Sequence, residues 1–317
     1  MWRPSTERLR ISTTSQLDAR SSRDARIGCR CVRNPIQRPQ GPDRARCAAF
    51  FMDQINNMLP LLSVRGLTKT YWRRRWIGSG AEVQAVRGVD LDLFAGKTIA
   101  VVGASGGGKS TLARCVAGLD QPTSGHVVLF GKTIVNPAVA RRHIQLIFQD
   151  PGASLNPRFS VAKALQEPLA IRRERGPWIA ERLQQVGLPG SLADQGTGQL
   201  SGGQKARLAL ARALVALGEA GPAILILDES LASLDLSVQA QMINLLVDVQ
   251  EKYGLAYMLI AHDLRLAAHM ADEVAVMFEG QIVERGAPHA LITAPKHLHT
   301  ARLLAARSAL DEIRCNA

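Results

Sequence analysis

The chain has 317 residues, of which 46% are hydrophobic and only 4% aromatic, so it can bury a sizeable and mainly aliphatic core. No run approaches the ~18 consecutive apolar residues that a membrane-spanning helix needs, which excludes a protein that crosses a bilayer by such helices. The net charge of +12 is weak support for nucleic-acid binding, because residues 1–51 carry +7 of it through eleven arginines and four carboxylates. The five cysteines form no evident disulfide framework, and the two in the body of the chain, Cys115 and Cys315, lack metal-ligand spacing, so we expect a reducing, cytoplasmic setting.

Residues 1–57 are predicted to be a disordered basic leader, since they show neither helical nor strand periodicity. Three interpretations of this leader stay open. The first is a basic arm that binds nucleic acid or lipid. The second is a targeting peptide rich in arginine and serine. The third is that translation starts at Met52 or Met58, so that the mature protein lacks this segment. We favour the last, because eleven arginines without a lysine are unusual for a selected basic arm.

From residue 58 the pattern becomes regular. Residues 61–67 and 83–94 alternate apolar and β-favouring side chains, which predicts an antiparallel β region. Residues 98–102 form a short apolar run that is typical of a strand. Residues 109–118 then predict a helix that ends at Gly118.

Strands and helices alternate in the rest of the body, which predicts an α/β fold with a mostly parallel sheet. The predicted strands are 127–130, 144–148, 224–227 and 257–260; the predicted helices are 161–188, broken near Pro168 and Pro177, then 204–217 and 237–252. No internal repeat is visible. We therefore expect one domain over 58–280, with a helical subdomain at about 150–215, and a C-terminal tail over 281–317.

A glycine-rich loop between the strand at 98–102 and the following helix matches the pattern G-x-x-x-x-G-K-[ST]. It comprises Gly103, Ala104, Ser105, Gly106, Gly107, Gly108, Lys109 and Ser110, with Thr111 next in the helix. Small residues let backbone N–H groups turn inward around phosphate oxygens, and the helix N-terminus adds positive potential. Lys109 is predicted to bridge the outer phosphates of ATP, and Ser110 to ligate Mg²⁺. The alternative, an ordinary glycine-rich turn, does not explain the full spacing.

Two carboxylates, Asp228 and Glu229, end the apolar strand at 224–227. The carboxyl edge of a parallel sheet is where ligands bind in α/β proteins. Asp228 is a candidate ligand of Mg²⁺, and Glu229 is the candidate general base that polarises the attacking water. Acidic pairs at strand ends are often only solvated, so the assignment depends on the phosphate loop upstream.

The pentapeptide Leu200-Ser-Gly-Gly-Gln204 is the most specific signal. Alone it is a good helix cap. A phosphate loop, this pentapeptide and a strand ending in Asp-Glu, in this order, resemble the ATP-binding cassette (ABC) ATPases. The resemblance implies a P-loop NTPase core with a mostly parallel sheet, an antiparallel β subdomain and an α-helical signature subdomain. It also implies that Ser201, Gly202, Gly203 and Gln204 contact, in trans, the γ-phosphate held by a second subunit.

Four further positions match the same family. Tyr71 resembles the aromatic residue that stacks on adenine, Gln149 the glutamine that senses Mg²⁺ and water, Asp235 the D-loop aspartate, and His262 the switch histidine. Two of them have plainer alternatives: Tyr71 as a surface tyrosine at a strand end, and His262 as a lone histidine at a strand end. With the order of the motifs, the resemblance implies that Glu229, His262 and Gln149 serve catalysis, and that Ser110, Gln149 and Asp228 serve the metal.

Residues 148–158 and the tail motifs at 280–286, 295–297 and 300–304 resemble the ATPases of peptide and nickel importers, whereas residues 196–199 lack the proline and aromatic pattern that often precedes the signature. The resemblance implies an ATPase peripheral to the cytoplasmic face of the inner or plasma membrane. Its expected partners are a second ATPase subunit, the same or paralogous, two permease subunits and, indirectly, a solute-binding protein, with no nucleic acid. The alternative is a soluble, non-transport ABC ATPase acting on nucleic acid or the ribosome.

Overall fold

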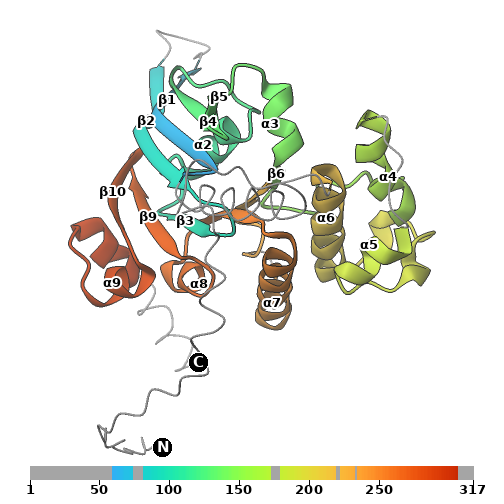
Figure 1. Ribbon diagram of the computed structural model, residues 1–317. Coiled ribbons are helices and arrows are strands. Elements are labelled where there is room, and N and C mark those ends of the chain that lie inside the picture. Colours follow the sequence, from blue (N-terminus) through green and yellow to red (C-terminus); the bar gives the residue numbers. More distant parts are fainter. Residues whose placement is uncertain (1–58, 74–80, 173–178, 219–221, 233, 306–317) are drawn as a thin grey trace, which may run out of the picture. The chain divides into compact units, whose positions relative to one another are not determined.

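The computed structural model describes residues 59–73, 81–172, 179–218, 222–232 and 234–305 (Figure 1). Within these residues the strands form two sheets, and the larger sheet has the strand order β10-β9-β3-β8-β7-β6. Its strands are β3 (Thr98–Val102), β6 (Ile144–Ile147), β7 (Ile224–Asp228), β8 (Ala256–Ala261), β9 (Glu273–Phe278) and β10 (Gln281–Gly286). All neighbours pair in parallel except β9 and β10. The predicted mostly parallel sheet is therefore confirmed. The leader at 1–57 lies outside the described residues.

The second sheet is antiparallel and has the order β2-β1-β4-β5. It contains β1 (Leu62–Arg73), β2 (Ala81–Leu93), β4 (Ser124–Leu129) and β5 (Lys132–Thr133). This sheet confirms the predicted antiparallel β region.

The hydrophobic core is divided by the larger sheet, because successive side chains of a strand point to opposite faces. Ile99 and Val101 of β3 pack with the antiparallel sheet and helix α2 (Lys109–Val116), which lies between the two sheets (Figure 1). Ala100 and Val102 pack on the other side with the remaining helices. The central strands β3, β7 and β8 are buried along their whole length, as their continuous apolar sequences predict.

The remaining helices are α3 (Pro137–His143), α4 (Val161–Arg172), α5 (Ile179–Gln185), α6 (Gly202–Leu217), α7 (Leu236–Tyr253), α8 (Leu264–Ala268) and α9 (Pro288–Thr293), with short 3₁₀ turns at Gly190–Leu192 and Thr197–Gln199. Helices α4, α5 and α6 lie together on one side of the sheet, where the helical subdomain is predicted (Figure 1). No helix among the described residues combines the length and apolar character of a membrane span.

The predicted helix break near Pro168 is wrong. Helix α4 continues through Pro168 to Arg172. A proline inside a helix removes one backbone hydrogen bond and costs ~3 kcal/mol or more when the helix stands alone. Here Pro168, Ala164 and Leu165 are buried on one face of α4, and Leu165 belongs to the same apolar cluster as α6. We attribute the continuity of α4 to this packing, which offsets the local penalty. Pro177, the second predicted break, lies outside the described residues.

Candidate functional site

The phosphate loop lies between the carboxyl end of β3 and the first residue of α2, as predicted. Gly106 and Gly108 have φ angles of +79° and +96°, a backbone region that disfavours side chains. Lys109 is 4% exposed, and its ammonium group donates hydrogen bonds to the carbonyl oxygens of Gly103 and Ala104, both at 2.9 Å. The loop therefore holds its own lysine at the position from which it can meet an anion.

The two carboxylates at the end of β7, Asp228 and Glu229, face this loop. The Ser110 hydroxyl donates to Oδ1 of Asp228 at 2.8 Å, and Nζ of Lys109 lies 3.6 Å from Oε1 of Glu229. Burial raises the pKa of Asp228, with a further rise from the charge of Glu229, while the bond from Ser110 opposes the shift. Glu229 has a φ of +48°, which is uncommon for a residue with a side chain and is a feature of functional sites.

Gln149 follows the end of β6 and joins the same cluster, since its Nε2 donates to Oε2 of Glu229 at 3.1 Å. Strand β8 lies between β3 and β7 in the sheet. His262 follows the end of β8, and its side chain is exposed. All these residues thus stand at the carboxyl edge of the parallel strands. The structure brings together the predicted lysine, serine, both carboxylates and the glutamine, and it places the histidine at the same edge.

Tyr71 lies on β1 and is 36% exposed. Its hydroxyl donates to Oδ2 of Asp120 at 2.8 Å, and burial, followed by this hydrogen bond, raises the pKa of the phenol. The ammonium of Lys69 lies 5.0 Å from the ring centroid. Sequence reasoning missed Asp120, because the pairing spans 49 residues.

The Ser201–Gln204 segment begins α6 with a reciprocal capping box. The Ser201 hydroxyl accepts from the Gln204 N–H at 3.2 Å, and the Gln204 amide oxygen accepts from the Ser201 N–H at 2.9 Å. Ser201 and Gly202 are exposed, whereas a Cβ atom at Gly203 would lie 2.9 Å from Cγ1 of Val238 on α7. Asp235 caps α7 by accepting from the Val238 N–H at 2.9 Å. Ser201 and Asp235 therefore cap two helices, α6 and α7, that are in contact at Gly203 and Val238.

The donor set at Ser110 and Asp228 fits a hard cation. A hydroxyl and a carboxylate oxygen 2.8 Å apart are ligands that Mg²⁺ prefers, and Mg²⁺ usually keeps few protein ligands beside waters and phosphate oxygens. The described residues hold no cluster of three or more His, Cys, Asp or Glu side chains that could bind a metal by itself. The pair is thus suited to a cation that arrives with a phosphate-bearing substrate.

Comparison with known proteins decides the family. Residues 86–232 match the family model described as "ABC transporter". The chain is 42% identical to the probable D,D-dipeptide transport ATP-binding protein DdpF of Escherichia coli, over 76% of each chain. The chain belongs to the ABC transporter family of ATP-binding proteins. It is also 38% identical to the dipeptide transport ATP-binding protein DppF of Haemophilus influenzae, over 82% of this chain and 81% of the relative.

A solved ABC structure gives the same fold. CbiO1 of Clostridium perfringens, part of the transporter complex CbiONQ, superposes with a TM-score of 0.61 at 28% identity, covering 80% of this chain and 99% of that one. The chain is accordingly an ABC ATPase. Its family resemblance, first seen in the motifs at residues 103–110 and 200–204, is confirmed.

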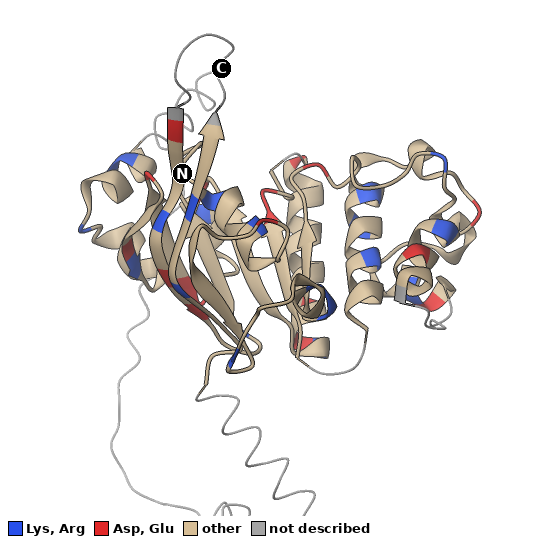
Figure 2. Ribbon diagram, turned by 90° about the horizontal axis from the view of Figure 1, so that it is seen from above, with Lys and Arg blue, Asp and Glu red and all other residues tan. Residues whose placement is uncertain are grey.

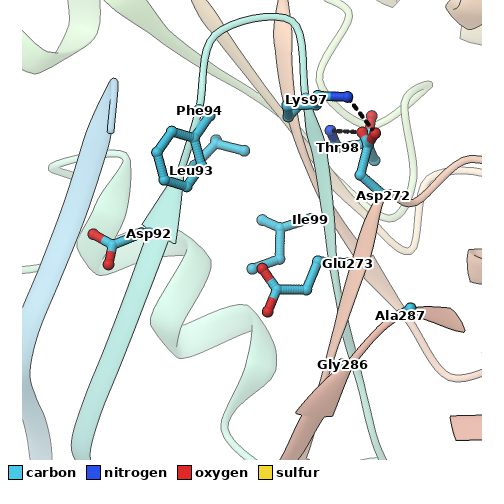
Figure 3. Close-up of a pocket in the computed structure, with 10 residues that line it drawn as sticks. All are labelled: Asp92, Leu93, Phe94, Lys97, Thr98, Ile99, Asp272, Glu273, Gly286 and Ala287. Carbon is cyan, nitrogen blue, oxygen red and sulfur yellow. Dashed lines mark hydrogen bonds and ion pairs between the residues drawn. The ribbon is translucent and has the colours of Figure 1, made fainter. Parts of the chain in front are cut away.

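A separate pocket of about 360 Å³ lies at the opposite end of the ABC domain's β3 (Figure 3). It is lined by the start of β3 at Thr98 and Ile99, not by the phosphate loop. Its carboxylates are already paired: Asp272 with Lys97 at 2.8 Å, Asp92 with Arg65 at 2.7 Å, and Glu273 with Arg285. This pocket therefore lacks the features of the nucleotide site.

Proposed function

We propose that this protein is the ATP-hydrolysing subunit of an ABC importer for short peptides. The proposal rests on one observation above all: Lys109 and Ser110 of the phosphate loop lie against Glu229 and Asp228, at 3.6 and 2.8 Å. Positioned charges and a base beside an anion cradle are the requirements of phosphoryl transfer to water. The names of the relatives support peptide as the solute class.

ATP enters with its phosphates in the loop at 103–110. Lys109 then exchanges its two carbonyl partners and its contact with Glu229 for phosphate oxygens, which frees the Glu229 carboxylate to orient water. Ser110 and Asp228 would hold Mg²⁺, which would supply positive charge that neutralises the triphosphate. Gln149, hydrogen-bonded to Glu229, keeps this carboxylate directed at the site. His262 contacts the γ-phosphate and Tyr71 stacks on the adenine.

The site is completed by a second ATPase subunit, identical or paralogous. Ser201 and Gly202 are exposed at the start of α6, a 16-residue helix whose first N–H groups and positive dipole end favour an anion. Each subunit's Ser201–Gln204 segment closes on the nucleotide of its partner and excludes water. Asp235 lies beside this segment in the fold and takes part in the same interface.

The permease contact lies in a groove of about 630 Å³ between α3, β6, α4 and α6. Its lining combines apolar Leu146, Phe148 and Ile171 with the basic Arg141 and Arg142. An amphipathic helix with a carboxylate on its polar side fits this chemistry. Because Phe148 precedes Gln149, a change at the nucleotide moves one wall of the groove. The protein would thus sit at the cytoplasmic membrane surface, bound to two permease subunits served by a solute-binding protein.

Charge distribution favours transport over nucleic-acid binding. Figure 2 shows Lys and Arg on many of the described elements, together with Asp and Glu on most of them, and not gathered on one element alone. A protein that tracks a phosphate backbone needs a continuous basic stripe.

Mixing two inactive variants tests the shared site. Lys109→Ala disables a subunit's own phosphate loop, and Ser201→Arg blocks the segment it offers to a partner. In a symmetric dimer of the two, one nucleotide site keeps both intact parts, so the mixture should regain up to about a quarter of wild-type ATPase activity. Each variant alone is the control. Activity in Ser201→Arg alone, or none in the mixture while wild type is active alone, would contradict the arrangement. Uptake of labelled dipeptide and of Ni²⁺ by cells lacking the gene then tests the solute class.

A further inference from the structure

The turn between β9 and β10 lies against the phosphate loop, although its contact residue Gly280 is 173 positions after Gly107 (280 − 107) in the sequence. Phe278 pairs with Gln281, and the two residues between them, Glu279 and Gly280, have φ angles of +46° and +83°. Two positive φ angles in a two-residue connection define a tight hairpin turn of the type that favours glycine. The turn therefore has a fixed shape and a fixed direction.

Gly280 joins three segments through its backbone. Its N–H donates to the carbonyl oxygen of Gly107 in the phosphate loop at 3.1 Å, and its carbonyl accepts from the N–H of Arg87 on β2 at 2.8 Å. It is buried, and a Cβ atom here would lie 2.9 Å from the carbonyl oxygen of Ala85 on β2. No side chain larger than hydrogen fits between the loop and β2 without displacing backbone.

Two glycines of the phosphate loop pack against the backbone of the same two strands, β9 and β2. A Cβ atom at Gly103 would lie 2.1 Å from the carbonyl oxygen of Met277, and one at Gly108 would lie 2.0 Å from the carbonyl oxygen of Ala85. Backbone thus touches backbone on the outer side of the loop. Two of the conspicuous glycines of the motif are required by this packing as well as by access to phosphate.

The hydrogen bond to Gly107 also sets the direction of an amide. In a planar trans peptide unit the carbonyl and the next N–H point in opposite directions. Because the Gly107 carbonyl is held towards Gly280, the N–H of Gly108 points away from the turn, towards the inner side of the loop. The Gly108 N–H belongs to the peptide unit that joins Gly107 to Gly108, one residue before Lys109.

We propose that Gly280 is a positioning residue for ATP binding: it holds the Gly107 peptide so that the anion cradle is already formed before the nucleotide arrives. Preorganised donors bind an anion without the cost of first reorienting the loop. This inference rests on the proposed function of the loop at 103–110. It assigns a role in the nucleotide site to the first residue of the tail motif at 280–286, which was not among the site residues predicted from the sequence.

The chain offers a matched control in the turn between β4 and β5. There Phe130 and Gly131 have φ angles of +51° and +72°, and a Cβ atom at Gly131 meets nothing within 4 Å. Gly131→Ala thus imposes the same kind of backbone strain in the same kind of turn, without touching the phosphate loop.

The test measures ATP affinity by titration calorimetry of the full-length protein with Mg²⁺-ATP, thermal unfolding, and steady-state KM and kcat. Both alanine variants should lose thermal stability through backbone strain, and Gly280→Ala should lose more because its Cβ also meets the backbone of Ala85. Gly280→Ala alone should weaken ATP binding, by about tenfold if one hydrogen bond is lost, and should raise KM while leaving kcat nearly unchanged.

Should Gly280→Ala fail to fold, the pair Gly280→Asn and Gly131→Asn replaces it, because asparagine tolerates positive φ while keeping the Cβ contact with Ala85. An affinity change below twofold at Gly280, or an equal change in the two turns, would overturn the inference. If the wild type itself does not bind ATP, the proposed function fails; if it binds and only the Gly280 effect is missing, the function stands and this inference alone falls.

Discussion

Replacing Glu229 by glutamine separates catalysis from binding more cleanly than any other single change in the site. Glutamine keeps the shape of the side chain, and its amide oxygen can still accept from Gln149. Lys109 loses an ionic contact at 3.6 Å but keeps two hydrogen bonds to carbonyls at 2.9 Å, so the loop stays closed around its lysine. Removal of the charge also relieves its repulsion of Asp228. We expect these opposed effects to leave stability within about 1 kcal/mol of wild type.

The rate should respond very differently. A positioned general base contributes typically 10²–10⁴-fold, so the barrier to hydrolysis should rise by about 3–5 kcal/mol. Phosphate release at saturating Mg²⁺-ATP measures this loss, while calorimetry should return a dissociation constant for ATP near that of wild type. With ATP retained, the variant should also accumulate as a dimer on size-exclusion chromatography.

Glu279→Gln is the matched control, because Glu279 is an exposed glutamate that also has a positive φ, +46°. It should hydrolyse ATP at the wild-type rate. Turnover of Glu229→Gln within tenfold of wild type would refute the assignment of the base. A similar loss in the control would show that the effect is not specific to the carboxylate of Glu229.

Four further outcomes follow from the geometry. Lys109→Ala should weaken ATP binding at least tenfold in calorimetry, because the buried ammonium is the loop's own cation. Asp228→Asn should abolish hydrolysis yet raise the melting temperature at neutral pH. Burial raises the pKa of Asp228, so the stability that the protonated carboxyl provides at low pH is lost as pH rises through that pKa. The gain in melting temperature should therefore vanish below pH ~4, where the carboxyl is protonated in both the folded and the unfolded state. Ser201→Ala should lower the free energy of unfolding, measured with denaturant, by about 1 kcal/mol because the helix cap is lost. Its ATPase activity should fall by more than this loss of stability accounts for. Tyr257→Phe should cost about 1 kcal/mol of stability and leave ATP affinity unchanged, because its buried hydroxyl donates only to the Leu246 carbonyl on α7, at 2.8 Å.

Sequence alone determined the local features of this protein. The apolar runs at β3, β7 and β8 predict buried parallel strands, because both faces of such strands are covered. The motif at 103–110 predicts a phosphate loop, since the spacing of glycines, lysine and serine is a property of consecutive residues. The capping box of Ser201 and Gln204 is likewise local, and the structure has it as a helix start. The family followed from these segments in their order.

Tertiary structure decided what lies against what. Strand β8 comes after β7 in the chain yet separates it from β3, and in this arrangement Glu229 lies opposite Lys109. The turn at Gly280 meets the loop at Gly107 through a contact that no local pattern encodes. Helix α4 passes through Pro168, against its local propensity. In each case the deciding free energy comes from burial and pairing between segments far apart in the chain, which a reading of neighbouring residues does not contain.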